Sequence, residues 1–404
     1  MSHIEVVDDH ECTKFEPSVN GFEGVEKRLE VAFNPYTSSK SNQGLRSLSR
    51  QKLHYLLKYV GCTIVSELHN NVFDSYVLSE SSLFIYPFRI ILKTCGKTQI
   101  LKCISVLLNF ASKLFLEPCF CKYSHATFLF PLDQPFPYTN FKEEVKYLDV
   151  FFGHMTSKAY IMVGDQQNWH IYSASTHNYT QSSLLKPIYM LEMCMTSLDK
   201  GFLKHFLNPV GTKRGVDMTR DSGIANILPS KSLISDYAFS PCGYSMNSMD
   251  EGGGLSTIHI TPEESHSYAS FEVLVYNPHS INIQQLVDGV LSCFKPQNVS
   301  ISIDVSYYMK CRDINVSYEG DSWGLRVPPK GYGCRSSNRE EMLGEYVVTF
   351  HSFRRNNESL DSINPMSLLP LGITLPNSEL VEKVMLLDYA SDSDHDPRSL
   401  ENEQ

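Results

Sequence analysis

The sequence lacks the short motifs that mark nucleotide-binding and zinc-dependent enzymes. It contains no G-x-x-x-x-G-K-[ST] phosphate loop, no G-x-G-x-x-G between a strand and a helix, and no H-E-x-x-H zinc helix. Basic residues are in deficit, because 35 Lys and Arg stand against 45 Asp and Glu for a formal charge of −10. Binding a polyanion needs a clustered excess of basic side chains, so we expect neither nucleic acid nor a membrane as a partner.

Long hydrophobic runs and targeting signals are also missing. The most apolar stretch, residues 100–120, is interrupted by charged and polar side chains and is too polar to span a bilayer. The first residues, MSHIEVVDDHE, carry acid where a targeting peptide carries base. The eleven cysteines show no paired spacing, and Cys119 and Cys121 lack a second pair of ligands. These absences predict a cytoplasmic protein with reduced thiols and no metal site.

The residues that are present predict a globular α/β protein. Hydrophobic residues make up 42% of the chain, which is ample for a core. Helical spacing occurs at residues 49–59, 99–116, 142–152, 186–198 and 283–294, and strand patterns lie between them, for example at 74–78, 82–86, 89–94 and 256–261. Residues 319–341 are expected to form a surface excursion. Residues 388–404 hold six acidic residues and one basic residue, and we interpret them as a disordered acidic tail.

One segment suggests a hydrolase. Gly243-Tyr-Ser-Met-Asn247 resembles a nucleophile elbow, in which Ser245 would pair with a histidine such as His259. Asn247 replaces the last glycine of that motif, however, and no helix is predicted after it. A Ser245/His259 hydrolase is therefore kept only as an alternative hypothesis.

Several separate blocks resemble one family, the eukaryotic S-adenosylmethionine decarboxylases. The blocks stand in the family's order, and the likeness spans residues 21–353, which we take as one domain behind an N-terminal extension of residues 1–20. They are Gly21-Phe-Glu-Gly-Val-Glu26, Tyr76-Val-Leu-Ser-Glu-Ser-Ser82, Ile91-Leu-Lys-Thr-Cys-Gly96, Pro241-Cys-Gly-Tyr-Ser-Met-Asn247, Thr257-Ile-His-Ile-Thr-Pro-Glu263 and Ser267-Tyr-Ala-Ser-Phe-Glu272.

The resemblance implies a fold, a reaction and a cofactor. The fold would be an α/β (α+β) four-layer αββα sandwich with two mainly antiparallel sheets covered by helices. The chain would be a proenzyme that cleaves itself at Glu80-Ser81 into a small chain 1–80 and a large chain 81–404. Ser81 would become a pyruvoyl group, the electron sink for decarboxylation, with no metal and no pyridoxal phosphate. The product would be decarboxylated S-adenosylmethionine, the aminopropyl donor for spermidine and spermine biosynthesis.

The resemblance also implies the site residues. For self-cleavage they are Glu80, Ser81, Ser245 and His259, of which Ser245 would hold the Glu80 carbonyl and His259 would remove the α-proton of Ser81. For catalysis they are Ser81 as the pyruvoyl group, Cys95 as the proton donor, Glu23 and Glu26. For substrate binding they are Phe22, Leu78, Phe239 and Glu263, with the two aromatic rings stacking on adenine.

A set of charged residues is implied as well, in the place where the animal form of the family binds putrescine. It comprises Arg28, Glu30, Lys93, Lys122, Asp217, Asp221 and Glu272. Arg28 and Lys122 resemble the plant form, in which built-in bases replace the diamine, so putrescine activation is not expected. The alternative hypothesis is a non-catalytic paralogue that binds and regulates an active decarboxylase. Such paralogues typically lose the junction serine or the processing pair, and this sequence keeps both.

Overall fold

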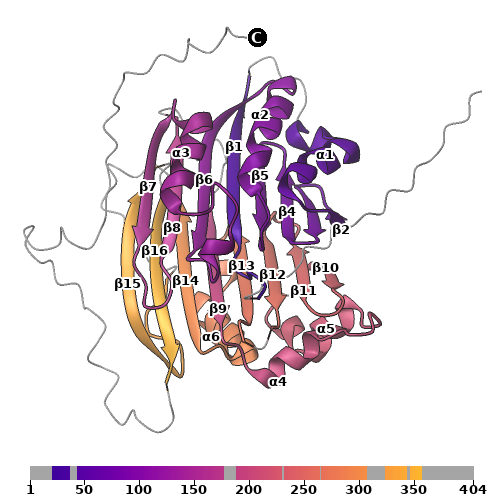
Figure 1. Ribbon diagram of the computed structural model, residues 1–404, viewed down its shortest axis with the longest axis vertical. Helices are drawn as coiled ribbons and strands as arrows, with labels where there is room; N and C mark the ends of the chain where they lie inside the picture. Colours follow the sequence, from indigo (N-terminus) through magenta and orange to yellow (C-terminus); the bar gives the residue numbers. More distant parts are fainter. Residues whose placement is uncertain are drawn as a thin grey trace, which may run out of the picture.

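The part of the chain that the structure describes forms two stacked antiparallel sheets of eight strands each (Figure 1). The structure is a computed structural model that describes residues 21–36, 43–176, 188–229, 232–263, 265–306, 324–343 and 346–356. The expected N-terminal extension and acidic tail lie outside these residues. Among the described helices, none is long and apolar enough to cross a membrane.

The first sheet has the strand order β2-β3-β4-β5-β1-β6-β8-β7. Its strands are β1 (Lys27–Pro35), β2 (Ile64–His69), β3 (Asp74–Leu78), β4 (Ser81–Tyr86), β5 (Arg89–Thr94), β6 (Leu116–Ala126), β7 (Thr156–Met162) and β8 (Trp169–Ser175). The outer face of this sheet is covered by α1 (Arg50–Val60), α2 (Ile104–Lys113) and α3 (Phe141–Phe152), whose buried side chains join those of the sheet in one core.

The second sheet repeats the same topology with every strand number raised by eight, in the order β10-β11-β12-β13-β9-β14-β16-β15. Its strands are β9 (Tyr189–Thr196), β10 (Leu233–Ala238), β11 (Tyr244–Met249), β12 (Leu255–Thr261), β13 (Tyr268–Val275), β14 (Asn298–Ser306), β15 (Tyr332–Met342) and β16 (Tyr346–Arg355). The helices α4 (Lys200–Leu203), α5 (Gly215–Asp221) and α6 (Ile283–Phe294) contribute to a second core on its outer face. The expected αββα sandwich is confirmed.

Helix positions follow from local sequence where capping residues mark them. The Ser49 side chain caps α1 by accepting from the Lys52 backbone amide, and Gly61 ends the helix in a left-handed conformation. The Asn140 and Asn282 side chains cap α3 and α6 in the same way. These are the helices for which the sequence-based boundaries lie within one or two residues of the observed ones.

Two predicted elements are wrong. The helix expected at residues 186–198 is instead β9, a strand between β13 and β14 that is buried almost throughout. Both faces of a central strand in this sandwich are covered, so its apolar run carries no two-residue alternation that would distinguish it from a buried helix. The surface excursion expected at 319–341 contains β15, whose alternating exposed side chains suit a strand at the edge of the sheet.

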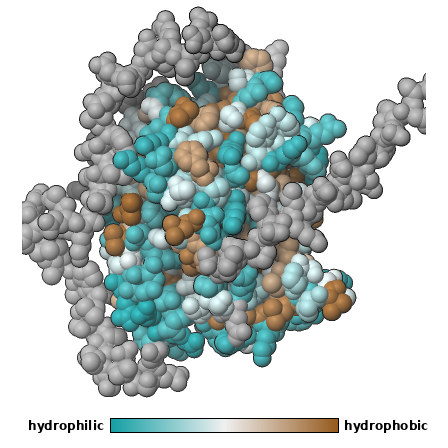
Figure 2. Space-filling view, in the orientation of Figure 1, coloured by the Kyte–Doolittle hydropathy of each residue, from teal (hydrophilic) through white to brown (hydrophobic). Residues whose placement is uncertain are grey.

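The surface carries no single large apolar face in the view of Figure 2. Hydrophilic residues predominate there, and the apolar ones occur in small separate groups. The buried apolar side chains form two large clusters, one for each sheet with its helices, and a smaller third cluster between the sheets. The layer between the sheets is different in kind, because it also buries many charged and hydroxyl side chains.

Candidate active site

The tight turn between β3 and β4 contains the Glu80–Ser81 bond. Leu78 pairs with Ser81 in the strand register, so only Ser79 and Glu80 connect the two arms. Ser81 is fully buried and has φ = 139°, a backbone conformation that a residue with a side chain rarely adopts. The Glu80 carbonyl accepts from the Cys95 backbone amide at 3.0 Å. The peptide bond is thus held in a strained, hydrogen-bonded turn at the inner face of the first sheet.

Four side chains surround this bond: Cys95, His259, Ser245 and Glu26. Cys95 Sγ lies 3.4 Å from the Glu80 carbonyl oxygen and 3.2 Å from Nε2 of His259. Nδ1 of His259 lies 2.7 Å from the Ser245 hydroxyl. The Ser81 hydroxyl donates to the Glu26 carboxylate. The structure therefore brings five of the predicted residues together, although they come from opposite sheets.

Burial sets the protonation of the Cys95 and His259 pair. It raises the pKa of the Cys95 thiol well above its usual value, and the nearby Glu80 and Glu26 carboxylates act in the same direction. Burial lowers the pKa of His259 and outweighs the opposing effect of Glu26. At neutral pH the pair is therefore a thiol beside a neutral imidazole, so the thiol can donate a proton and the imidazole can accept one.

Glu26 stays ionised despite complete burial. Burial alone would raise its pKa, but Lys93, His259 and hydrogen bonds from Ser270 and Ser81 together outweigh that effect and lower it. Lys93 Nζ lies 3.2 Å from the Glu26 carboxylate. Glu26 can therefore act as a fixed hydrogen-bond acceptor for the Ser81 hydroxyl.

Phe22 and Glu263 lie together at the mouth of this site. The Phe22 backbone amide donates to the Glu263 carboxylate at 2.9 Å. A side chain at Gly96 would lie 3.3 Å from the Phe22 ring, so the glycine keeps that ring close to the Cys95 segment. Phe239 lies in the turn between β10 and β11, where its amide donates to the Gly243 carbonyl. Leu78 is fully buried in β3, two residues before Glu80.

The Glu23 carboxylate is hydrogen-bonded to the local backbone. Its carboxylate accepts from the amides of Val25 and Phe130, at 2.9 and 2.8 Å. Burial raises its pKa. The observed contacts give Glu23 a role in fixing the segment that carries Phe22 and Glu26.

Charged residues fill the centre of the layer between the sheets. We call this set the inter-sheet charge cluster; it comprises Glu26, Arg28, Glu30, Arg89, Lys93, Lys122, Glu192, Glu272 and Asp304. Lys93 Nζ lies 2.9 Å from Glu272 and 3.5 Å from Glu192. Arg28 bridges Glu272 and Glu30, at 3.2 and 2.8 Å. Five predicted members are present: Arg28, Glu30, Lys93, Lys122 and Glu272.

Two predicted members are absent from the cluster. Asp217 and Asp221 lie on α5, outside the second sheet, and pair with Arg214 and Arg220. Their side chains are 28% and 53% exposed, so they need no buried counter-ion. These two acids were assigned to the cluster because they match acids of the animal form of the family, and the resemblance carries no information on how α5 lies relative to the sheets.

Three members were missed. Glu192 lies on β9, the strand taken for a helix, and burial together with Glu272 raises its pKa to about 7. Asp304 on β14 contacts Lys122, and Arg89 on β5 lies 3.6 Å from Glu30. Each of these residues occupies a strand position whose side chain faces the other sheet. That position can be recognised from the sequence only after the strands have been assigned correctly.

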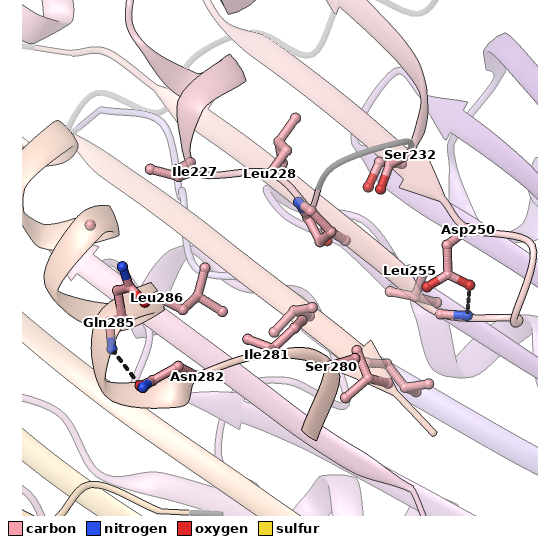
Figure 3. A pocket seen from close by; sticks show the side chains of 18 of the residues that line it. Ile227, Leu228, Ser232, Asp250, Leu255, Ser280, Ile281, Asn282, Gln285 and Leu286 are labelled. Atoms are coloured by element: carbon pink, nitrogen blue, oxygen red, sulfur yellow. Dashed lines mark hydrogen bonds between the residues drawn. The ribbon is translucent and has the colours of Figure 1, made fainter. Parts of the chain in front are cut away.

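The cavities distinguish the two faces of the second sheet. A cavity of about 500 Å³ lies on the outer face, between α6 and the segment around Ile227 (Figure 3). Its floor includes Ser248 and Ser256, which point away from Ser245 and His259 because neighbouring residues of a strand alternate between faces. This cavity is therefore separate from the site at Ser81.

Comparison with known proteins agrees with this geometry. Residues 19–354 match the adenosylmethionine decarboxylase family. The S-adenosylmethionine decarboxylase proenzyme of Ipomoea nil is 46% identical over 331 residues, covering 80% of this chain and 87% of the relative. Proenzyme 3 of Arabidopsis thaliana is 48% identical over 362 residues, covering 87% and 98%.

A solved structure shares the fold. The crystal structure of a Trypanosoma brucei AdoMetDC-delta26 monomer superimposes with a TM-score of 0.52 at 24% identity, covering 68% of this chain and 99% of that chain. The family match over residues 19–354 includes the segments that carry Ser81, Cys95, Ser245 and His259. The chain therefore belongs to the adenosylmethionine decarboxylase family.

Proposed function

We propose that this chain is the proenzyme of a plant-type, pyruvoyl-dependent S-adenosylmethionine decarboxylase that makes its own prosthetic group from Ser81. The observation that carries the proposal is the strained Glu80–Ser81 turn facing Ser245, His259 and Cys95. Family membership supports the reaction class, which is that of a carboxy-lyase.

Self-cleavage begins at the Ser81 hydroxyl. Its oxygen attacks the Glu80 carbonyl carbon, the hydroxyl proton passes to the peptide nitrogen, and that nitrogen leaves as the amine of residue 81, so that the amide becomes an ester. Glu26 accepts from this hydroxyl, and the Cys95 amide donates to the carbonyl oxygen on which charge develops. Relief of the strained φ at Ser81 offsets part of the cost of forming an ester from an amide.

The ester is then opened by elimination. The neutral His259 imidazole is suited to remove the α-proton of Ser81, whereupon the bond between Cβ and Oγ breaks and Glu80 leaves as a carboxylate. Water then releases ammonia and leaves a pyruvoyl group at the head of the large chain. The Ser245 hydroxyl contacts His259 rather than the Glu80 carbonyl, so its role is to orient the imidazole.

The same residues suit the decarboxylation of S-adenosylmethionine. The pyruvoyl group supplies the electron sink when formed. Cys95 holds a proton at its buried thiol, beside the position of Ser81, and can deliver it to the carbon that loses carbon dioxide. The Glu263 carboxylate can accept from ribose hydroxyls, and the Phe22 and Phe239 rings can pack against the adenine.

Intact-mass spectrometry of the purified, denatured protein tests the proposal. Two chains are expected, residues 1–80 and 81–404, the larger one lighter by one ammonia than a chain that begins with serine. Release of carbon dioxide from carboxyl-labelled S-adenosylmethionine should accompany them. A single chain of 45.9 kDa that persists on incubation would contradict the proposal and favour a regulatory paralogue.

Activity is expected to be independent of putrescine. The cavity inside the charge cluster has a volume of about 30 Å³ and is lined by Glu30, Lys122, Asp304 and Tyr346, among others. That volume accommodates about one or two water molecules and is too small for a diamine. The Lys122 ammonium, which contacts Asp304, already provides a cation there.

A putrescine titration of the processed enzyme measures whether the diamine changes the decarboxylase activity. The expected change in kcat/KM is less than about twofold, since a ligand that cannot bind has no coupling energy to contribute. Lys122→Ala is the informative variant, because it enlarges the cavity and removes its cation, and we expect it to gain a response to putrescine. Several-fold activation of the unmodified protein would contradict the prediction.

A further inference from the structure

Asn247 joins both arms of the hairpin that contains the Glu80–Ser81 bond. This side chain is fully buried between the sheets. Its Nδ2 donates to the Tyr76 carbonyl at 2.9 Å, and its Oδ1 accepts from the Ser82 hydroxyl at 2.6 Å. Tyr76 lies on β3 and Ser82 on β4, so one amide from the opposite sheet grips the chain on each side of the scissile bond.

The position of Asn247 on β11 relates this grip to the processing pair. Asn247 is paired with Thr257, and Ser245 with His259, in consecutive same-face positions of the β11–β12 ladder. Positions two residues apart along a strand lie about 7 Å apart and point to the same side. One pair of residues therefore presents Ser245 and His259 to the bond, and the adjacent pair holds the arms, with Thr257 lying 3.0 Å from the Ser82 hydroxyl.

The chemistry of the side chain matches its two partners. A carbonyl oxygen needs a donor and the Ser82 hydroxyl needs an acceptor, and a neutral amide is the smallest side chain that supplies both in fixed geometry. A carboxylate would place a second acceptor against the Tyr76 carbonyl oxygen, and the two oxygens would repel each other. An aliphatic residue would leave the Tyr76 carbonyl and the Ser82 hydroxyl without this hydrogen-bond partner.

We propose that Asn247 is a positioning residue for self-cleavage. By tying Tyr76 and Ser82 to the strand that carries Ser245, it sets where the Glu80 carbonyl and the Ser81 hydroxyl lie relative to His259. A displacement of about 1 Å between reacting groups is enough to cost about 100-fold in rate. After cleavage Tyr76 and Ser82 belong to different chains, and the same amide keeps the two new ends in place. This inference rests on the proposed function.

The rate at which the full-length chain cleaves itself, followed by mass spectrometry after cell-free synthesis, tests the inference. Asn247→Leu keeps the number and branching of the side-chain heavy atoms and removes both hydrogen bonds, so we expect cleavage to slow by about tenfold or more. Ser82→Ala, which loses one arm of the grip, should slow it less. If Asn247 acts through Ser82, the double variant should cleave no more slowly than Asn247→Leu alone.

Thr219→Val is the matched control, because Thr219 is a buried hydroxyl on the outer side of the same sheet and contacts Gly215 and Tyr244 but not the hairpin. It should lower the melting temperature without slowing cleavage.

Equal slowing in Thr219→Val and Asn247→Leu, or cleavage of Asn247→Leu at the rate of the unmodified chain, would overturn the inference. If Asn247→Leu does not fold, Ser82→Ala decides: slowed cleavage supports the inference and an unchanged rate overturns it. Failure of the unmodified chain to cleave would instead refute the proposed function and the inference with it.

Discussion

Substitution of Ser81 by alanine is expected to leave one uncleaved chain without decarboxylase activity. Alanine has no hydroxyl to attack the Glu80 carbonyl and no oxygen to eliminate, so neither the ester nor the pyruvoyl group can form. The loss should be complete rather than partial, because the variant lacks the electron sink on which the reaction depends. Mass spectrometry reports the chain, and release of labelled carbon dioxide reports the activity.

The neighbouring hydroxyl provides the control. Ser79 lies in the same turn, and its side chain accepts from the Thr63 amide at 3.1 Å, away from Ser81. Ser79→Ala should therefore cleave to the same two chains as the unmodified protein. Cleavage of the Ser81→Ala chain after Glu80 would mean that another nucleophile attacks this bond, and the role given to Ser81 would be wrong.

Substitution of Lys93 by methionine is expected to destabilise the fold by about 3–5 kcal/mol, the usual effect of removing one partner from a buried ion pair. The Lys93 ammonium contacts three buried carboxylates, Glu26, Glu192 and Glu272. Without it, Glu192 should take up a proton first, because its pKa already lies at about 7. Glu26 would lose the cation that helps to keep it ionised, so self-cleavage should slow as well.

Chemical denaturation of the uncleaved Ser81→Ala chain, with and without Lys93→Met, measures the difference on a single polypeptide. Lys146→Met is the control, since Lys146 pairs with Glu143 on the surface of α3 with 53% of its side chain exposed. That loss should be less than about 1 kcal/mol. Adding Glu272→Gln to Lys93→Met should recover part of the stability. A Lys93→Met chain as stable as its parent would show that the cluster does not depend on this cation.

The site was more predictable from sequence than the fold around it. Polar residues between two short apolar runs marked the turn at Glu80, and family blocks marked Ser245 and His259. The misassigned strand has a clear physical cause: β9 is buried on both faces, so its Leu, Met and Glu residues gave no strand alternation, and Glu192 was missed with it. The misplacement of Asp217 and Asp221 has a different cause. Nothing in the local sequence distinguishes an exposed acidic residue from a buried one.

Contacts between the sheets could not be predicted from patterns at all. Ser82 and Asn247 are 165 residues apart in sequence, and Lys122 and Asp304 are 182 apart. Each of these side chains is unremarkable in its own strand. Which of these side chains meet depends on how one sheet is placed over the other. That placement results from the packing of the whole layer between the sheets and not from any single strand.

The place of β1 governs how the two chains of the mature protein would come to be partners. This strand lies inside the first sheet, hydrogen-bonded to β5 on one side and to β6 on the other, and it precedes the cleavage point while both neighbours follow it. Cleavage would therefore yield a heterodimer whose interface had already formed within the uncleaved chain. Such a pair forms without an encounter in solution, because its interface is built while the chain is still a single polypeptide. Once unfolded, however, it would have to reassemble from two molecules, so the mature protein should recover from denaturation far less readily than its precursor.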